Sequence, residues 1–173
     1  MEQAILDFQQ WFSANGGSFH PSIVLKSDSS GVRPVVREDA NTIESRESVV
    51  MCPSSIMVSY VHAQQSEILK PLIDRDPCSI SNQIITLRVF IIEQYLLADR
   101  SFWWPYLKTL PQPSNSDFLH ATPLWNDEDL RWLDKTNLAQ ATRLKKTTWM
   151  QEYEQAVECL KTKAPRFVQH STW

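Results

Sequence analysis

Glycine and cysteine are both scarce in this sequence, with three of each among 173 residues. So little glycine, beside a hydrophobic content of 42% and seven tryptophans, excludes a collagen-like or disordered chain and favours an aromatic-rich globule. The cysteines are odd in number and far apart, so they offer neither a disulfide framework nor a Cys-x-x-Cys metal knuckle. They are Cys52, Cys78 and Cys159, and a reducing compartment suits them.

An excess of charge of either sign is also missing. Lys and Arg number 17 and Asp and Glu 20, and this balance provides no electrostatic footprint for nucleic acid or for an anionic membrane surface. The N-terminus has no basic segment followed by a long apolar run, as a secretory signal would. The most apolar window, residues 84–98, contains Arg88 and Glu93 and is too short to span a bilayer. We therefore expect a cytoplasmic protein without nucleic-acid or membrane partners.

Several catalytic motifs have no counterpart in the chain. It contains no G-x-S-x-G elbow, no phosphate-binding glycine loop and no H-E-x-x-H zinc motif. No metal site is expected, because no two histidines are spaced to share a helix face with a carboxylate. The histidines are His20, His62, His120 and His170. Cys52 follows an apolar run and has no basic neighbour in sequence, so we interpret it as a small hydrophobe rather than a nucleophile.

The first third of the chain reads as one helix followed by strands. Residues 4–12 carry apolar side chains at helical spacing, and Gly16 and Gly17 end that helix. A polar turn at residues 26–31 predicts that the first two strands form a hairpin. The predicted strands are residues 22–25, 32–37 and 48–52.

Helical periodicity takes over in the rest of the chain. One apolar helix runs through Leu87 and Leu96, and a longer one begins at residues 136–137. The buried stripe of the longer helix is predicted to be Leu138, Ala141, Leu144, Thr148, Tyr153, Ala156 and Leu160. The fold class is therefore α+β: a helix and small β region over about residues 1–63, then a mostly helical region over about residues 64–173, in a single domain.

The densest group of aromatic residues lies in residues 101–111, which read S-F-W-W-P-Y-L-K-T-L-P. This run resembles the S-x-W-x-P-Y-L-x-x-L-P segment of SET-domain methyltransferases of the plant Rubisco large-subunit methyltransferase type and their fungal relatives. Residues 8–20 resemble the F-x-x-W…G-G opening of that family, and residues 31–63 its first strands. Residues 123–152 resemble its helical insertion. The resemblance implies a truncated SET-like domain, because the C-terminal half of the SET fold would follow Trp173.

The resemblance also implies a site for S-adenosylmethionine, which the family holds partly through a G-x-G backbone loop. The matching residues here are Gly31, Val32 and Arg33, so the second glycine is replaced, and Pro34 removes a backbone donor. The family's Asn-His pair and later Tyr have no match. We therefore expect no bound cofactor and no methyl transfer by this chain alone, with S-adenosylmethionine bound only if the chain is part of a methyltransferase.

Aromatic residues of the helical region are candidates for lining a pocket, because flat polarisable faces hold apolar or conjugated ligands. The alternative is that each of them is ordinary core, which the resemblance also explains. No catalytic residue is assigned. The pocket candidates are Tyr60, Tyr95, Asp99, Arg100, Phe102, Trp103, Trp104 and Tyr106.

Three functions remain open. The main hypothesis is a SET-like protein that has lost methyl transfer and acts on a small organic molecule, as an isomerase or cyclase of fungal secondary metabolism that folds its substrate into a reactive conformer. The first alternative is a non-catalytic interaction module or homodimer, since truncation would expose apolar surface. The second is a fragment of an S-adenosylmethionine-dependent protein-lysine N-methyltransferase. The first hypothesis ranks highest because the altered glycine loop lies within the chain.

Overall fold

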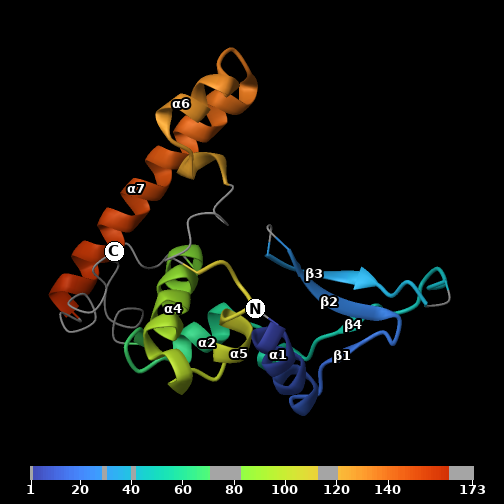
Figure 1. Cartoon of the computed structure of the whole chain (residues 1–173). Helices are drawn as coiled ribbons and strands as arrows, with labels where there is room; N and C mark the ends of the chain where they lie inside the picture. Colours follow the sequence, from blue (N-terminus) through green and yellow to red (C-terminus); the bar gives the residue numbers. More distant parts are fainter. Residues whose placement is uncertain (1, 29–30, 40–41, 71–82, 113–120, 164–173) are drawn as a thin grey trace. The chain divides into compact units, whose positions relative to one another are not determined.

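The computed structural model describes residues 2–28, 31–39, 42–70, 83–112 and 121–163 (Figure 1). The chain divides into two compact units, each built from two separate stretches. The first unit comprises Met1–Val58 and Ala98–Phe118, and the second comprises Ser59–Leu97 and Leu119–Trp173. The predicted division near residue 63 lies close to the first boundary between the units. The return of the aromatic segment to the first unit was not predicted.

The first unit begins with helix α1, Glu2–Ala14, which buries Ile5 and Phe12. The helix ends because Gly16 adopts a φ of +82°, which favours glycine, and because the N–H of Gly17 donates to the Phe12 carbonyl oxygen at 2.9 Å. The predicted helix and its glycine stop are confirmed.

Two small antiparallel sheets follow (Figure 1). Strands β2 (Ile23–Asp28) and β3 (Gly31–Val36) form the predicted hairpin, although residues 26–28, predicted as turn, extend β2 and pair as far as Asp28 opposite Gly31. Strand β4 (Val50–Met51) falls within the third predicted strand and pairs with β1 (Ser18–Phe19). Sequence reasoning missed β1, because two residues show no periodicity.

Aromatic side chains form the core of the first unit. The 3₁₀ segment η1 (Ser54–Ile56) follows β4, and the chain later returns through η2 (Ala98–Arg100) and helix α5 (Trp104–Leu107). Helices α1 and α5 are neighbours, with the rings of Phe8 and Tyr106 6.0 Å apart. Phe8 also contacts Phe12 and Phe19 at ring-centroid distances of 5.5 and 6.3 Å. Such pairs add stability beyond the area they bury.

The second unit contains helices α2 (Tyr60–Gln65) and α4 (Gln83–Leu97), which lie side by side (Figure 1). The predicted apolar helix is thus confirmed. Helix α4 buries three polar side chains, Thr86, Glu93 and Gln94, together with its apolar face. Ser66 follows α2, and its hydroxyl donates to Glu93 Oε1 at 2.7 Å, which gives the buried carboxyl a partner.

The rest of the second unit is built around one long helix. The segment η4 (Thr122–Leu124), helix α6 (Asp127–Leu130) and the segment η5 (Arg131–Leu133) precede helix α7 (Asn137–Lys163). Asn126 caps α6, since its side chain accepts from the Asp129 N–H at 2.8 Å. Thr136 does the same for α7 by accepting from the Ala139 N–H at 3.2 Å. The predicted start of α7 is confirmed.

Part of the predicted buried stripe on α7 is wrong. Leu138, Leu144 and Tyr153 are 49, 68 and 49% exposed, and Ala141 is exposed as well. The early turns of the helix bury other small residues in their place. The buried residues are Ala139, Thr142, Ala156, Cys159 and Leu160. Small side chains allow close approach of neighbouring segments: the hydroxyls of Thr142 and Thr122 lie 2.9 Å apart. Overall the α+β class is confirmed. Among the described helices, none is both long and apolar enough to cross a membrane.

Candidate functional site

The first unit contains a hollow of about 380 Å³ with an aromatic wall. Helix α1, the segment from β4 through η1, and helix α5 all contribute to its lining. The aromatic lining residues are Phe8, Trp11, Phe12 and Tyr106, and the others are Cys52, Ile56, Met57 and Val58. None of these side chains carries a formal charge, so the hollow is adapted to apolar contact.

One lining residue carries a buried polar atom that lacks a partner among the described residues. Nε1 of Trp11 is buried and donates no hydrogen bond within the described part of the chain. A buried donor left unpaired costs about 1–3 kcal/mol relative to a paired one, so such atoms in native proteins call for an explanation. The ring of Phe102, 46% exposed, lies edge-on to Trp11 at 5.3 Å.

The predicted aromatic pocket candidates differ in position: some belong to the core of the first unit, and others lie at or beside the hollow. Trp103 is 8% exposed, and its Nε1 donates to the Ile56 carbonyl oxygen at 2.9 Å, a contact that holds the aromatic segment against η1. Trp104 is half-buried at the start of α5. Tyr106 lines the hollow. Phe102 lies beside Trp103 as well as Trp11, with its ring perpendicular to the Trp103 ring at 5.2 Å.

The remaining pocket candidates do not gather at this hollow. Asp99 and Arg100 are exposed in η2. Tyr60 and Tyr95 are half-buried and belong to the second unit, on α2 and α4. Their roles as binding residues stay predictions.

The predicted cofactor residues lie in a strand. Gly31 opens β3 with a φ of +114°, and a Cβ built there would meet nothing within 4 Å. Val32 and Arg33 continue the strand, and Arg33 Nε lies 2.6 Å from Asp28 Oδ2 in an ion pair across the hairpin. Gly31 itself is buried, and the Arg33 side chain is already paired with Asp28.

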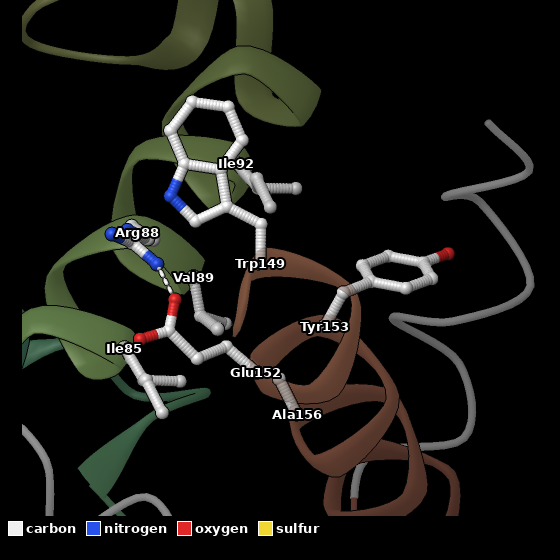
Figure 2. Close-up of a pocket in the computed structure, with 8 residues that line it drawn as sticks. All are labelled: Ile85, Arg88, Val89, Ile92, Trp149, Glu152, Tyr153 and Ala156. Atoms are coloured by element: carbon white, nitrogen blue, oxygen red, sulfur yellow. Dashed lines mark hydrogen bonds and ion pairs between the residues drawn. The ribbon is translucent and has the colours of Figure 1, made fainter. Parts of the chain in front are cut away.

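The second unit has a smaller hollow, about 240 Å³, between α4 and α7 (Figure 2). Half of its lining residues are aliphatic, and an ion pair between Arg88 and Glu152 joins the two helices beside Trp149. Nε1 of Trp149 is the other buried side-chain donor without a partner in the described residues. The remaining lining residues are Ile85, Val89, Ile92, Tyr153 and Ala156.

Three of the described carboxyl groups have shifted pKa values. One is Asp39, where a hydrogen bond from Arg37 lowers the pKa. The other two are Asp7 and Glu93. In the first unit, a hydrogen bond from Lys108, helped by one from Gln3, lowers the pKa of Asp7, and this ion pair links α1 to the residue after α5. In the second unit, burial raises the pKa of Glu93, although hydrogen bonds from Ser66 and Gln94 oppose the shift. Both groups join segments distant in sequence, and both lie outside the linings of the hollows.

Sequence reasoning missed the α1 side of the aromatic hollow. Phe8, Trp11 and Phe12 were attributed to the buried stripe of an amphipathic helix, which is correct for Phe12 at 4% exposure. Trp11 carries the one available signal, a polar indole nitrogen within an apolar stripe, for which the sequence offers no partner.

The described residues contain no group of three or more potential metal ligands. His20 Nδ1 accepts from the Ser22 N–H at 3.1 Å, and His62 Nδ1 lies 2.9 Å from the Ser59 hydroxyl. His120, His170 and Cys78 lie outside the described residues. Cys159 is buried and Cys52 is half-buried.

Comparison with curated proteins finds two protein N-methyltransferases. The chain is 26% identical over 157 residues to the ribosomal lysine N-methyltransferase set10 of Schizosaccharomyces pombe, which covers 88% of this chain and 27% of that protein. It is 28% identical over 137 residues to the actin-histidine N-methyltransferase of Rhinolophus ferrumequinum, which covers 75% of this chain and 20% of that protein. No family model matches the sequence.

Solved structures show the same fold. Rubisco LSMT bound to sinefungin and monomethyllysine superposes with a TM-score of 0.72 at 19% identity, over 95% of this chain and 36% of that one. Rubisco LSMT bound to AdoMet gives a TM-score of 0.62 at 20% identity, over 93% and 34%. The predicted resemblance to the SET-domain methyltransferases is confirmed.

This resemblance corrects the function predicted from the sequence. The prediction of no methyl transfer by this chain alone, with isomerase or cyclase activity as a possibility, is contradicted by its relatives, both of which are N-methyltransferases acting on proteins. That prediction gave the altered glycine loop and the unmatched Asn-His pair and Tyr more weight than a resemblance spread over the whole chain. The homodimer, the small-molecule partner and the cytoplasmic location stay predictions.

Proposed function

We propose that this chain takes part in S-adenosylmethionine-dependent transfer of a methyl group to a nitrogen of a protein side chain. The observation that carries the proposal is the chemistry shared by the two curated relatives, one acting on lysine and the other on histidine. Both side chains offer a nitrogen lone pair when neutral, so the shared requirement is a neutral nitrogen held in line with the methyl donor.

The hairpin supplies the part of the cofactor site that this chain fits. Gly31 combines a φ that favours glycine with open space on the side where a side chain would project. Arg33 and Pro34 fit less well, because the first is a long side chain paired with Asp28 and the second has no backbone N–H. The fit therefore rests on Gly31, which would hold the cofactor through close backbone approach.

The reaction requires little covalent chemistry from the protein. The cofactor, when bound, supplies an electrophilic methyl group on a sulfonium. The nitrogen lone pair of the acceptor would form the new N–C bond while the C–S bond of the sulfonium breaks, with S-adenosylhomocysteine as the leaving group and the nitrogen proton passing to solvent. The protein's contribution is alignment and exclusion of water from the methyl group. The first unit of this chain offers a positioned backbone at Gly31 for that task.

Isothermal titration calorimetry with S-adenosylmethionine and with sinefungin tests the proposal. We expect both to bind the purified chain and to compete, and we expect Gly31→Ala to weaken binding by roughly tenfold or more, because alanine disfavours a positive φ and its Cβ occupies the open side. Ser27→Ala, an exposed change on the facing strand, is the matched control and should bind normally.

A methyl-transfer assay completes the test. Tritium from labelled S-adenosylmethionine should appear on lysine or histidine of acceptor proteins incubated with the chain, and Gly31→Ala should lower the incorporation. A wild-type chain that neither binds the two compounds nor transfers label contradicts the proposal.

A further inference from the structure

We propose that His20 is a pH-sensitive switch at the corner between the two sheets of the first unit, which comprises residues 20–23. The neutral imidazole ring closes this corner by accepting a backbone hydrogen bond. The protonated ring pairs with Glu47 and releases that bond. No contact of this switch involves Gly31 or the cofactor, so it goes beyond the proposed methyl transfer.

The backbone of His20 joins the two sheets. Its N–H donates to the Val49 carbonyl oxygen at 2.8 Å, which extends the pairing of β1 with β4 by one residue. Its carbonyl oxygen accepts from the N–H of Ile23, the first residue of β2, also at 2.8 Å. A change at the His20 side chain therefore acts where the chain passes from one sheet to the other.

The ring of His20 closes the same corner. Its Nδ1 accepts from the Ser22 N–H at 3.1 Å, which is the contact that an Asn or Asp side chain makes in an Asx turn. The Ser22 carbonyl oxygen in turn accepts from the Arg37 N–H at 2.8 Å, at the open end of the β2–β3 hairpin. An imidazole nitrogen accepts a hydrogen bond only when it carries no proton. The geometry therefore requires a neutral ring with its proton on Nε2.

Glu47 favours the opposite state of the ring. Its Oε2 lies 3.5 Å from His20 Nε2 and also accepts from the Glu44 N–H at 2.9 Å, which holds the carboxylate in place. Protonation puts a hydrogen on Nδ1, so the ring and the Ser22 N–H become two donors that face each other. The His20 side chain is 21% exposed, so protons from solvent reach it. The Ser22 contact thus stabilises the neutral ring, and Glu47 stabilises the charged one.

Other charged groups adjoin the corner on the chain after β3 and on the loop before β4. They are all exposed, and they are Arg37, Glu38, Asp39, Glu44 and Arg46. Arg37 is paired with Asp39, since its Nη2 lies 2.7 Å from Asp39 Oδ2. Among the described residues, Glu47 is the one whose carboxylate lies within 4.0 Å of the ring. Glu47 is therefore the charged group that opposes the Ser22 contact.

The tautomer of His20 is the first test. Long-range proton–nitrogen NMR spectra of the full chain at about pH 8 should show a proton on Nε2 and none on Nδ1. The signals of this ring are identified by their absence in His20→Asn. A ring that carries a proton on Nδ1 at this pH, alone or together with one on Nε2, contradicts the proposal, because such a ring cannot accept from Ser22.

Amide hydrogen exchange measures the switch itself. Between about pH 8 and about pH 5, protection of the Ser22 amide relative to its intrinsic exchange rate should fall roughly fivefold, because one hydrogen bond is lost. The fall should follow protonation of the His20 ring. Gly17 is the internal control: its N–H donates to the Phe12 carbonyl oxygen in the same unit and should keep its protection. Unchanged protection at Ser22 overturns the proposal, and so does an equal loss at Gly17, which would indicate general destabilisation by acid.

Two histidine variants locate the effect. His20→Asn keeps an acceptor for the Ser22 N–H in an Asx turn but cannot take up a proton, so protection of Ser22 should stay high at both pH values. His62→Asn is the matched control, because Nδ1 of His62 lies 2.9 Å from the Ser59 hydroxyl in the second unit. It should leave the response of Ser22 unchanged. A response that persists in His20→Asn, or that disappears in His62→Asn, overturns the assignment.

Glu47→Gln tests the opposing partner. Glutamine still accepts from the Glu44 N–H but no longer stabilises a charged ring, so the pH midpoint of the Ser22 change should move downward. Glu38→Gln removes the same charge from an exposed position after β3 and should leave the midpoint in place. A midpoint that stays or rises in Glu47→Gln contradicts the proposal. The wild-type spectra decide the proposal even where a variant does not fold, and none of these readings involves S-adenosylmethionine.

Discussion

At position 17, glycine is required by the packing of a neighbouring side chain rather than by the backbone conformation. A Cβ at this position would lie 2.6 Å from atoms of the Phe12 ring, closer than real contacts allow. Phe12 is 4% exposed and is surrounded by other rings, so it has little room to shift. Gly16, one residue earlier, is instead required for its positive φ.

We therefore expect Gly17→Ala to lower the free energy of unfolding by about 1–3 kcal/mol, the usual effect of overpacking a core. Urea unfolding followed by circular dichroism measures the change. Ser13→Ala, on an exposed position of α1, is the control and should change stability by no more than about 0.5 kcal/mol. Equal stability of Gly17→Ala and wild type would show that the Phe12 ring can move aside.

Glu93 makes stability depend on pH in a predictable direction. Burial raises its pKa in the folded protein above the unfolded value, so the folded state binds the proton more tightly than the unfolded state does. The contribution of the Glu93 carboxyl to the free energy of unfolding is fully present below its pKa in the unfolded chain. It is lost as the pH rises through its pKa in the folded protein. Glu93→Gln keeps an acceptor for Ser66 but cannot ionise.

Urea midpoints between about pH 4 and about pH 8 should therefore fall less with rising pH in Glu93→Gln than in wild type. Glu67→Gln changes an exposed glutamate that follows Ser66 in the sequence; it is the control and should give the wild-type dependence of the urea midpoint on pH. The Asp7 carboxyl acts in the opposite direction, since Lys108 lowers its pKa and its contribution is lost as the pH falls. Parallel profiles for wild type and Glu93→Gln would contradict the assignment.

At the level of single elements, β3 explains how a proline fits into a strand. The Arg37 N–H donates to the Ser22 carbonyl oxygen at 2.8 Å, and in this register hydrogen-bonded pairs alternate along the hairpin. Pro34, opposite Leu25, falls on a pair that exchanges no hydrogen bonds. Its missing N–H therefore faces the outer edge of β3, where proline discourages pairing with another strand.

Helix α7 marks the limit of sequence periodicity. The start of the helix was predictable because Thr136 acts as a local cap, and the final turns were predictable because Ala156 and Leu160 are both buried. The buried face near the start of the helix was not predictable from the sequence. Ala139 and Thr142 are buried there and Leu138 is not, because burial depends on which segments pack against the helix. The aromatic hollow has the same origin: local pattern identified Tyr106, but only tertiary packing brings Trp11 to it.

The exposure pattern on α7 gives a direct comparison of two leucines. Leu144 is 68% exposed, so Leu144→Lys should change stability by no more than about 0.5 kcal/mol. Leu160 is 5% exposed, and Leu160→Ala should cost about 2–5 kcal/mol through lost burial and a residual cavity. Denaturant midpoints of both variants measure the difference. A large loss in Leu144→Lys would contradict the exposure of that side chain.

At the level of the whole molecule, the order of the chain ties the two units together. The chain passes from the first unit to the second, returns for Ala98–Phe118, and leaves again. Neither unit is a continuous stretch of chain. To bring the two stretches of one unit together, the intervening segment, which belongs to the other unit, must form a closed loop. Loop closure of this kind costs conformational entropy that both units share. If the chain is a single domain, as predicted, its two units should therefore unfold together in one cooperative transition.

We expect one unfolding transition, even though the chain divides into two compact units. A variant with Trp125, Trp132, Trp149 and Trp173 all changed to Phe retains three tryptophans, at positions 11, 103 and 104, all in the first unit. Its fluorescence then reports the first unit, while far-ultraviolet circular dichroism reports mainly α4 and α7 of the second. Coincident urea midpoints by the two signals support one cooperative domain, because a single two-state transition gives the same midpoint for every probe. Separate midpoints would show that the units unfold independently despite their interleaved chain.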